Sequence, residues 1–407
     1  MKLLYITLCA PYREVRHAGG QTVYYYLSRF LKEKDMDIKL MTFCSEQESV
    51  LLDGEEFCSV TEKIVVPDGI KKFIWNCQSI GSKINPWYRY GNGLSKRLAF
   101  EMIKRLKCLK MSGYAPEIII MEWTEIILYI RLIKDIFPDA KYIASEQLIE
   151  FQKLQREGDN QKNCMIKGYL RCRMNNMKER ERAALSCSDL IIIQNEKDKR
   201  LLKGLNLPDS KLLVISPFYH RSKIDYQRKN NNIIFFGAMR GKENIDAVRW
   251  FAKYVMPELT ELDCSFMIIG SGARETLSDL ECKNIKVIGF VDEIDRWLAE
   301  AMCFVVPLQL GGGIKVKCLE ALYSGIPLLT NEIGIEGIPA KDGRDYYHCV
   351  NASDYIERIK ELYYLQKPAV NGKRVIEDSF PLEISYKNYI ERIRSLVYEK
   401  NEGIDII

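Results

Sequence analysis

The chain has 407 residues, of which 47% are hydrophobic and 28% are charged, and its formal net charge at pH 7 is +5. This composition excludes a mostly disordered chain, and the length predicts two or three domains. No run approaches the roughly 20 apolar residues of a membrane-spanning helix, so the sequence argues against an integral membrane protein.

The first apolar stretch is followed by Pro11-Tyr12-Arg13, which is typical of a buried strand rather than a signal peptide, and we expect a cytoplasmic protein. Short β-rich runs then alternate with helical patterns, which predicts parallel sheets covered on both faces. In the first half, strands are predicted at 3–8, 38–43, 64–66, 118–121, 142–144, 190–193 and 212–215, and helices at 22–34 and 94–111.

A polar segment, 222–232, is interpreted as a linker, and the alternation restarts after it. Strands are predicted at 233–236, 266–269, 287–288, 303–306 and 327–330, and helices at 244–261 and 383–400. The predicted fold class is α/β, with two doubly wound Rossmann-like domains that face a cleft. The first comprises residues 1–221, on which the C-terminal helix at 385–407 packs back, and the second comprises 222–384.

Cysteine and histidine usage argues against metal and disulfide frameworks. The thirteen cysteines contain no CxxC pair, which predicts reduced thiols. The three histidines are His17, His220 and His348, and none has a second ligand at metal spacing, so we expect no metal and no cofactor. His17 is either a substrate contact or a silent loop residue, and the other two are interpreted as structural.

Positive charge is concentrated in the first half of the chain. Residues 71–110 contain ten Lys/Arg and one acid, and residues 151–182 contain nine Lys/Arg and four acids. This asymmetry predicts an anionic partner for the first half of the chain, either a membrane surface or an acidic ligand, and we expect no nucleic-acid partner. The helix at 94–111 carries an apolar stripe with basic residues mostly opposite, and aromatic residues precede it at 73–75 and 86–90. It is either a core-facing helix with a solvated basic face or a surface that docks on anionic lipid. The stripe is Leu94, Leu98, Met102, Leu106 and Leu109, and the bases are Lys96, Arg97, Lys104, Lys107 and Lys110.

The most informative stretch is 307–327, in which a strand runs into Gly311, Gly312 and Gly313 before a helix opens near residue 314. Glycines let the backbone approach a bulky anion, and a helix N-terminus attracts phosphate. Lys317 and Glu320 lie three residues apart on one helical face. A solvated Lys–Glu pair is the alternative interpretation, but the apolar residues around the pair favour a buried helix whose charges point into a cleft.

The string from Gly311 to Ala321, followed by 325–327 and 334–337, resembles the donor-site signature of family 4 retaining glycosyltransferases, which have the GT-B fold. Ala18-Gly19-Gly20 resembles the family's first-domain glycine loop. Residues 236–244, 269–272 and 287–291 resemble successive strand ends of its second domain. The resemblance implies the donor-binding residues Gly19, Gly20, Arg240, Lys242, Gly270, Gly289, Phe290, Val291, Gly311, Gly312, Gly313, Ile314 and Lys315.

Three departures from the family pattern matter. Many members carry a pair of glutamates in which Glu320 would be the second, whereas Gly312 stands at the first position, as in a subgroup with a glycine-rich donor loop. Ala238 stands where members often have Arg, which leaves Arg240 and Lys242 as candidates for diphosphate contact. The first-domain histidine is missing, and Glu146, within 144–147, is a candidate replacement.

The resemblance implies transfer of a sugar from a nucleoside diphosphate to an acceptor hydroxyl with retention, in surface polysaccharide or glycolipid assembly. We expect the acceptor to be a saccharide or a lipid-linked saccharide, and the catalytic residues to be Lys317, Glu320 and Glu146. A lipid-linked acceptor would place the cytoplasmic protein peripherally on the inner face of the membrane. The alternatives are a GT-B sugar-nucleotide epimerase and a catalytically silent nucleotide-binding homologue. A dehydrogenase is the weakest alternative, because the Gly-rich string that begins at Gly270 ends in Glu275 where the dinucleotide fingerprint requires Gly or Ala.

Overall fold

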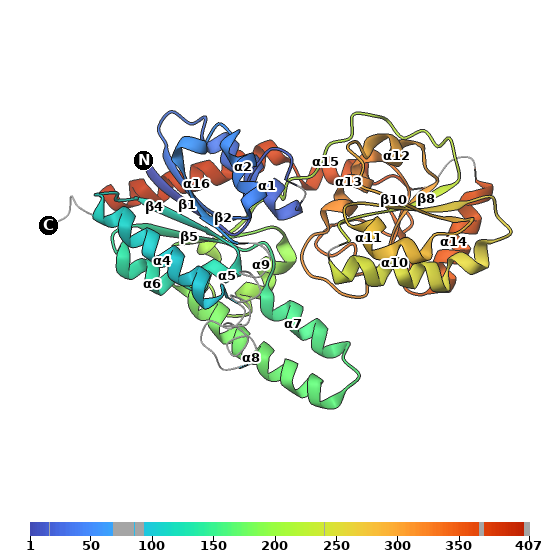
Figure 1. The fold of residues 1–407 in the computed structure, drawn as a ribbon, viewed down its shortest axis with the longest axis horizontal. Helices are drawn as coiled ribbons and strands as arrows, with labels where there is room; N and C mark the ends of the chain where they lie inside the picture. The colour runs from blue at the N-terminus through green and yellow to red at the C-terminus, as the bar shows by residue number, and fades with distance from the viewer. Residues whose placement is uncertain (16, 68–84, 86–92, 240, 366–369, 403–407) are drawn as a thin grey trace. The chain divides into compact units, whose positions relative to one another are not determined.

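The computed structural model describes residues 1–402 apart from 16, 68–84, 86–92, 240 and 366–369. The chain forms two compact units. The first comprises Met1–Ser216 and Leu382–Ile407, and the second comprises Pro217–Pro381. The chain thus leaves the first unit before the polar segment 222–232 and returns to it for the last helix. In each unit, helices lie on both faces of one sheet (Figure 1).

The first unit contains a seven-stranded sheet in the order β3-β2-β1-β4-β5-β6-β7, with all neighbours parallel. The direction of strand addition reverses between β1 and β4. The central strands are rich in Ile and Leu because both of their faces are buried. The strands are β1 (Lys2–Thr7), β2 (Asp37–Cys44), β3 (Thr61–Val65), β4 (Ile118–Glu122), β5 (Lys141–Ser145), β6 (Leu190–Ile193) and β7 (Leu212–Val214).

Five helices of the first unit, α1, α2, α4, α8 and α9, begin after a residue whose side chain caps them. α1 begins at Ala18, before the predicted 22, because the His17 side chain accepts the backbone N–H of Gly20. Gly19 and Gly20 therefore form the first turn of a helix rather than a loop. The helices are α1 (Ala18–Phe30), α2 (Glu46–Asp53), α4 (Lys96–Met111), α5 (Thr124–Ile127), α6 (Ile130–Ile136), α7 (Glu150–Asp159), α8 (Cys164–Ser186), α9 (Glu196–Lys203) and α16 (Leu382–Glu402).

The last helix, α16, packs on the first unit. Arg394 donates to Glu33 at 2.8 Å and to Asp35, while Tyr389 packs edge-on against Tyr26 and Phe30.

The helix α4 packs on the core through its apolar side, because four of the five stripe residues predicted for it are buried in the core. The stripe therefore faces the protein rather than a membrane. The aromatic segments predicted upstream of α4, at 73–75 and 86–90, lie outside the described residues.

The second unit contains a six-stranded parallel sheet in the order β10-β9-β8-β11-β12-β13. The strands are β8 (Asn232–Phe236), β9 (Ser265–Ile269), β10 (Ile285–Gly289), β11 (Cys303–Val306), β12 (Leu328–Thr330) and β13 (Tyr347–His348). The helices are α10 (Lys242–Tyr254), α11 (Ala273–Leu277), α12 (Asp295–Glu300), α13 (Val316–Ser324), α14 (Ala352–Tyr364) and α15 (Lys373–Ser379).

Two local predictions for the second unit need correction. The single helix expected over 244–261 ends at Tyr254, and a short 3₁₀ turn that contains Pro257 follows it, because proline lacks the N–H that an α-helix needs. The strand β13 was not predicted, since two residues are too short for a periodic pattern. Among the described residues, no helix is long and apolar enough to span a bilayer.

Candidate functional site

In the second unit, the predicted donor residues gather at the carboxyl edge of the sheet, where strand order reverses between β8 and β11. Such a switch point is the usual ligand site of an open α/β sheet, because the loops that follow the two strands diverge there. Helices α10 and α13 follow these two strands, and neither begins with a capping side chain. The backbone N–H groups of Asn244 and Cys318 donate to the carbonyls of Gly241 and Lys315, so the N–H groups of the first two residues of each helix remain for an anion.

Glycines allow the strand ends at this edge to approach one another. Gly270 has a φ of +140°, and a Cβ there would lie 1.9 Å from the carbonyl oxygen of Gly237. A Cβ on Gly237 would lie 2.6 Å from Nζ of Lys317, and one on Gly289 would lie 3.2 Å from Nε of Arg274. Gly270 and Gly289 thus have packing roles of their own, whether or not they touch a donor.

The side chain of Lys315 stabilises the loop Gly311–Gly313 by hydrogen bonds to its carbonyl groups. Its Nζ donates to the carbonyl oxygens of Gly312 at 3.0 Å and Gly313 at 2.7 Å, and it lies 3.9 Å from the buried Glu336. In a trans peptide the N–H points opposite to the C=O. The N–H groups of Gly313 and Ile314 therefore point away from Lys315. The sequence predicted that Lys315 binds the donor. In the structure, its hydrogen bonds orient this loop.

Lys317 reaches across the switch point from α13 to the end of β8. Its Nζ donates to Oδ1 of Asn244 at 2.6 Å and lies 4.5 Å from the ring centroid of Phe235, while the amide of Asn244 donates to the carbonyl of Ala238 at 2.8 Å. Burial lowers the pKa of Lys317 to about 8. Asn244 is the one hydrogen-bond acceptor of this ammonium among the described residues, so two of the three N–H donors of Lys317 can bind a ligand.

Glu320 lies one turn further along α13 and is only 8% exposed. Burial raises the pKa of Glu320 to about 7, while a backbone hydrogen bond from His220 and the charge of Lys317 act in the opposite direction. His220 is itself held by Asp295, with 2.9 Å between Nε2 and Oδ1. The position of Glu320 was predicted from the sequence, but the hydrogen bond from His220 was not, because about 100 residues separate the two.

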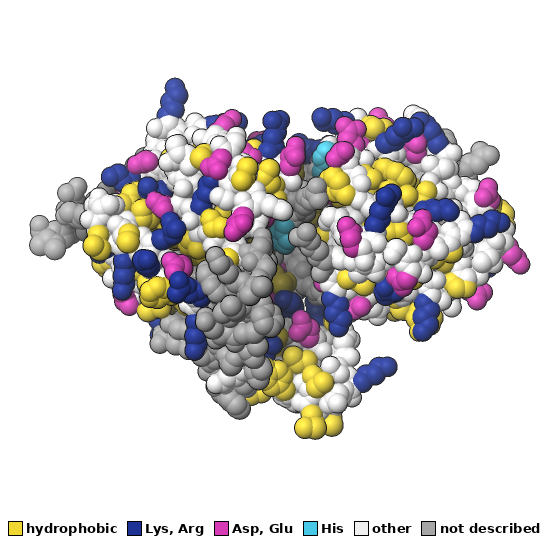
Figure 2. Space-filling view, in the orientation of Figure 1, with side chains coloured by type: hydrophobic (Ala, Val, Ile, Leu, Met, Phe, Trp, Pro, Cys, Tyr) yellow, Lys and Arg dark blue, Asp and Glu magenta, His cyan; other side chains and the backbone are white. Residues whose placement is uncertain are grey.

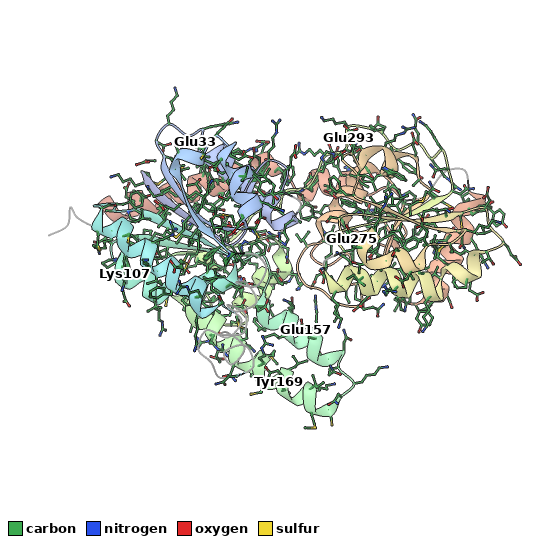
Figure 3. The ribbon with its side chains drawn as sticks, viewed as in Figure 1. Glu33, Lys107, Glu157, Tyr169, Glu275 and Glu293 are labelled. Carbon is green, nitrogen blue, oxygen red and sulfur yellow. The ribbon has the colours of Figure 1, made fainter. Side chains whose placement is uncertain are left out.

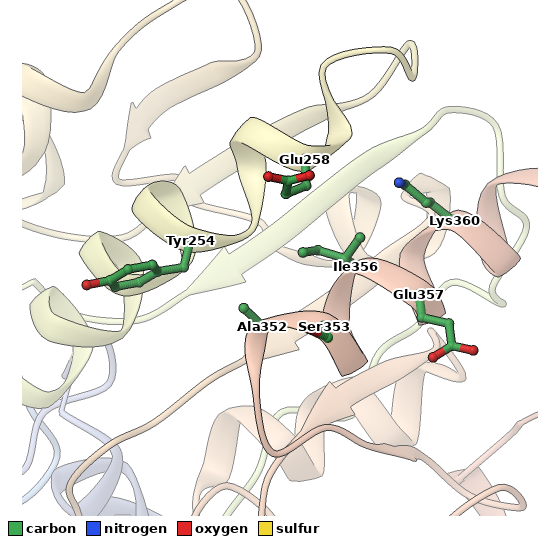
Figure 4. Close-up of a pocket in the computed structure, with 7 residues that line it drawn as sticks. All are labelled: Tyr254, Glu258, Ala352, Ser353, Ile356, Glu357 and Lys360. Carbon is green, nitrogen blue, oxygen red and sulfur yellow. The ribbon is translucent and has the colours of Figure 1, made fainter.

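The other residues predicted to bind the donor in the second unit differ in their exposure. Lys242 is exposed in the first turn of α10, and Phe290 is 49% exposed just after β10. Val291 is half-buried, and Ile314 is buried. Arg240 lies outside the described residues. The pocket between α10 and α14 in Figure 4 is lined by Tyr254, Glu258, Ala352, Ser353, Ile356, Glu357 and Lys360, and none of these is a predicted site residue.

The first unit has its own switch point between β1 and β4, where Trp123 lies next to Gly19. Trp123 has a φ of +81°, which is rare for a residue with a side chain, and its buried Nε1 has no hydrogen-bond partner among the described residues. Its ring lies 5.4 Å from that of His17, and a Cβ on Gly19 would lie 2.3 Å from Cη2 of Trp123. Nothing in the sequence predicts the strained backbone of Trp123.

Glu146 follows β5 at the same edge, but it is buried. The hydroxyl of Thr124 donates to its Oε2 at 2.5 Å, whereas Oε1 has no partner among the described residues. Burial and the neighbouring Glu181 raise the pKa of Glu146 well above its usual value. Glu181 accepts the backbone N–H groups of Glu150 and Phe151 at the start of α7. Burial thus favours the protonated form of Glu146, which can donate a hydrogen bond.

No cluster of three or more His, Cys, Asp or Glu in the part of the chain that the structure describes could hold a metal ion. The expectation of metal-independent activity stays a prediction.

The fold as a whole is that of GT-B glycosyltransferases. Sucrose-phosphate synthase from Thermosynechococcus elongatus is similar, with a TM-score of 0.67 at 11% identity over 98% of this chain and 99% of that one. HepE from Anabaena, solved with UDP and glucose, has a TM-score of 0.63 at 12% identity over 97% of this chain and 100% of that one. At such identities the likeness concerns the fold alone.

Residues 230–364 match the family described as "Glycosyl transferases group 1", so this part of the chain is similar to the group 1 glycosyltransferases. A protein described as an "Uncharacterized 44.6 kDa protein in cps region" of Klebsiella pneumoniae is 26% identical over 196 residues, which make up 43% of this chain and 49% of that protein. The chain thus matches about half the length of this relative. The expected fold and family are confirmed, whereas the glycine-rich subgroup stays a prediction.

Proposed function

We propose that the protein transfers a sugar from a nucleoside diphosphate to an acceptor hydroxyl with retention at the anomeric carbon. The observation that carries this proposal is the position of Lys317, a buried ammonium with two N–H donors to spare, beside the uncapped start of α13. This arrangement suits a diphosphate, whose negative charge grows as the glycosidic bond breaks.

In the proposed reaction, the bond between the anomeric carbon and the diphosphate oxygen breaks, and its electron pair stays on the diphosphate. Lys317, the N–H groups of Gly313 and Ile314 and the start of α13 stabilise that charge. The acceptor hydroxyl attacks from the same face and gives its proton to the departing diphosphate oxygen, so no protein carboxylate serves as nucleophile. As a carboxylate, Glu320 holds the ribose diol.

The remaining predicted residues have supporting roles in this proposal. Gly19 and Gly20, at the start of α1, approach the donor phosphates from the first unit, and Arg240 and Lys242 contact the diphosphate. Phe290 and Val291 border the nucleotide. Glu146 replaces the family histidine, and its hydroxyl partner Thr124 fixes its orientation.

Two relatives support the choice of substrate and process. HepE was solved with UDP and glucose, which makes a uridine donor the first to test. The Klebsiella pneumoniae relative is encoded in a cps region, which favours surface polysaccharide or glycolipid assembly. The proposed acceptor is therefore a saccharide or a lipid-linked saccharide, and the proposed location is the cytoplasmic face of the membrane.

The test is a panel of nucleotide sugars with purified protein, scored by thermal shift and by release of nucleoside diphosphate. One donor should stabilise the protein and be consumed, and Lys317→Ala and Glu320→Gln should each abolish both effects. Lys283→Ala and Glu281→Gln, at exposed positions of the same unit, are matched controls and should behave as the parent. Conversion of a donor to its epimer without release of diphosphate would instead identify an epimerase. Binding without turnover, even with an acceptor extract, would identify a silent homologue.

A further inference from the structure

The helical hairpin of α7 and α8 extends beyond the sheet of the first unit and ends in an exposed tip (Figures 1 and 3). The two helices pack closely near its middle, where a Cβ on Gly158 would lie 3.6 Å from Cβ of Leu170. Past this crossing, every residue from 159 to 168 except Gln161 is exposed. We call residues 159–168 the hairpin tip. Glu157 on α7 and Tyr169 on α8 mark its base in Figure 3.

The hairpin tip exposes two large apolar side chains. Met165 is 82% exposed and Ile166 is 46% exposed. Ile166 lies one turn before Leu170 and so extends the stripe of α8 that meets α7, beyond the residue at which α7 ends. Hydrophobic side chains also gather over this end of the hairpin in Figure 2. The two side chains would lose unfavourable contact with water if the tip entered an apolar phase.

Basic residues flank this apolar tip. Between Asp159 and Glu179 the chain has five Lys/Arg and no acid. Three of the five, Lys162, Lys167 and Arg171, are exposed within two turns of Met165. Exposed apolar side chains ringed by base are the pattern of a segment that lies in the interface of an anionic bilayer.

We propose that the hairpin tip docks on an anionic lipid bilayer, with Met165 and Ile166 among the headgroups and Lys162, Lys167 and Arg171 against lipid phosphates. This inference rests on the proposed function only in that a lipid-linked acceptor makes the membrane useful. A soluble polyanion would be bound by the bases alone, so the exposure of Met165 favours lipid as the occupant.

The sequence analysis offered α4 as a surface that docks on anionic lipid. In the structure, this helix is a suitable control for the hairpin tip. The apolar stripe of α4 is buried, Arg97 pairs with Glu101, and Arg105 pairs with Glu62. Lys107, labelled in Figure 3, is exposed on α4 together with Lys104. These two lysines serve as a control of equal charge type on a helix that buries its apolar stripe but exposes Phe100 and Met111.

The experiment is flotation of the full chain with vesicles of phosphatidylcholine alone or with phosphatidylglycerol added, at 50 mM and 500 mM salt. The parent should float with the anionic vesicles at low salt, and high salt should release most of it. Lys162→Glu/Lys167→Glu/Arg171→Glu should lower the partition coefficient by about 100-fold, since each basic residue near an anionic leaflet contributes about fivefold, or ~1 kcal/mol. Lys104→Glu/Lys107→Glu should change it less than threefold.

A second variant isolates the apolar contribution. Met165→Ser/Ile166→Ser should weaken vesicle binding by about tenfold at low salt. It should also abolish the binding that the parent retains at high salt. All substituted side chains of the tip are exposed, so unchanged thermal unfolding is expected and checks that the variants fold.

The proposal is overturned if the parent floats equally with neutral and anionic vesicles or if the tip variants float as the parent does. It is also overturned if the tip binds heparin but not anionic vesicles, which would make it a polyanion site, or if only the α4 variant loses binding. Because none of these readouts requires turnover, failure here leaves the donor-binding test of the proposed function untouched. Loss of donor binding would likewise leave vesicle binding unchanged.

Discussion

Replacement of Lys317 by methionine tests the central feature of the site. Methionine fills the volume beside Phe235 without the charge, so the variant removes the contact to the diphosphate with little change in packing. One charge-assisted hydrogen bond is worth about 1.5–3 kcal/mol, which corresponds to about 10- to 150-fold weaker binding of the nucleoside diphosphate. Release of nucleoside diphosphate from the sugar donor should fall at least as much.

The folded protein should tolerate this change. The pKa of Lys317 is lowered from 10.5 to about 8, so burial of its ammonium opposes folding by on the order of 3 kcal/mol near neutral pH. Methionine removes that cost but leaves Oδ1 of Asn244 without its donor, a loss of about 1–3 kcal/mol. The two effects offset one another, and the urea midpoint should move little.

The pH dependence gives a sharper signature of the same residue. Lys317 loses its proton as pH rises through about 8, so affinity of the parent for the diphosphate should fall by nearly tenfold per pH unit above pH 8. The Lys317→Met variant, which has no such proton, should bind weakly at every pH without this decline. Isothermal titration at pH 7, 8 and 9 measures both effects, with Lys283→Met as the control. Parent and variant affinities within threefold at pH 7, or equal slopes above pH 8, would refute the assignment.

Three further predictions follow from other features. Gly270→Ala should destabilise the second unit by about 3 kcal/mol or more in urea unfolding, since its Cβ would overlap the carbonyl oxygen of Gly237. Gly343→Ala, where φ is +71° and the space is open, should cost only about 1–2 kcal/mol, and equal losses would contradict the overlap. Transfer should persist in EDTA, and a strict requirement for manganese or magnesium would reject anion stabilisation by lysine and main-chain N–H groups. Glu146→Gln should leave the unfolding free energy within about 1 kcal/mol of the parent, because burial favours the protonated carboxyl group, which glutamine resembles in shape. It should still lower transfer at least tenfold, and undiminished transfer would remove Glu146 from the catalytic set.

The sequence by itself determined the fold class, because parallel sheets buried on both faces produce apolar runs that alternate visibly with amphipathic helices. It also identified the loop at Gly311–Gly313 and the helix with Lys317 and Glu320, since that motif is continuous in the chain. Element boundaries were less certain: α1 begins at Ala18 because the side chain of His17 caps it, and no periodic pattern reports a cap.

Only the tertiary structure decided which distant residues meet. It joined Lys317 to Asn244, Glu320 to the backbone of His220 and Glu146 to Thr124, all contacts between segments that the order of strands in the sheets brings together. It also showed that the apolar stripe of α4 is buried, whereas Met165 is exposed beside base. An amphipathic pattern states that a helix has an apolar face, but only the packing of its neighbours determines whether that face is covered.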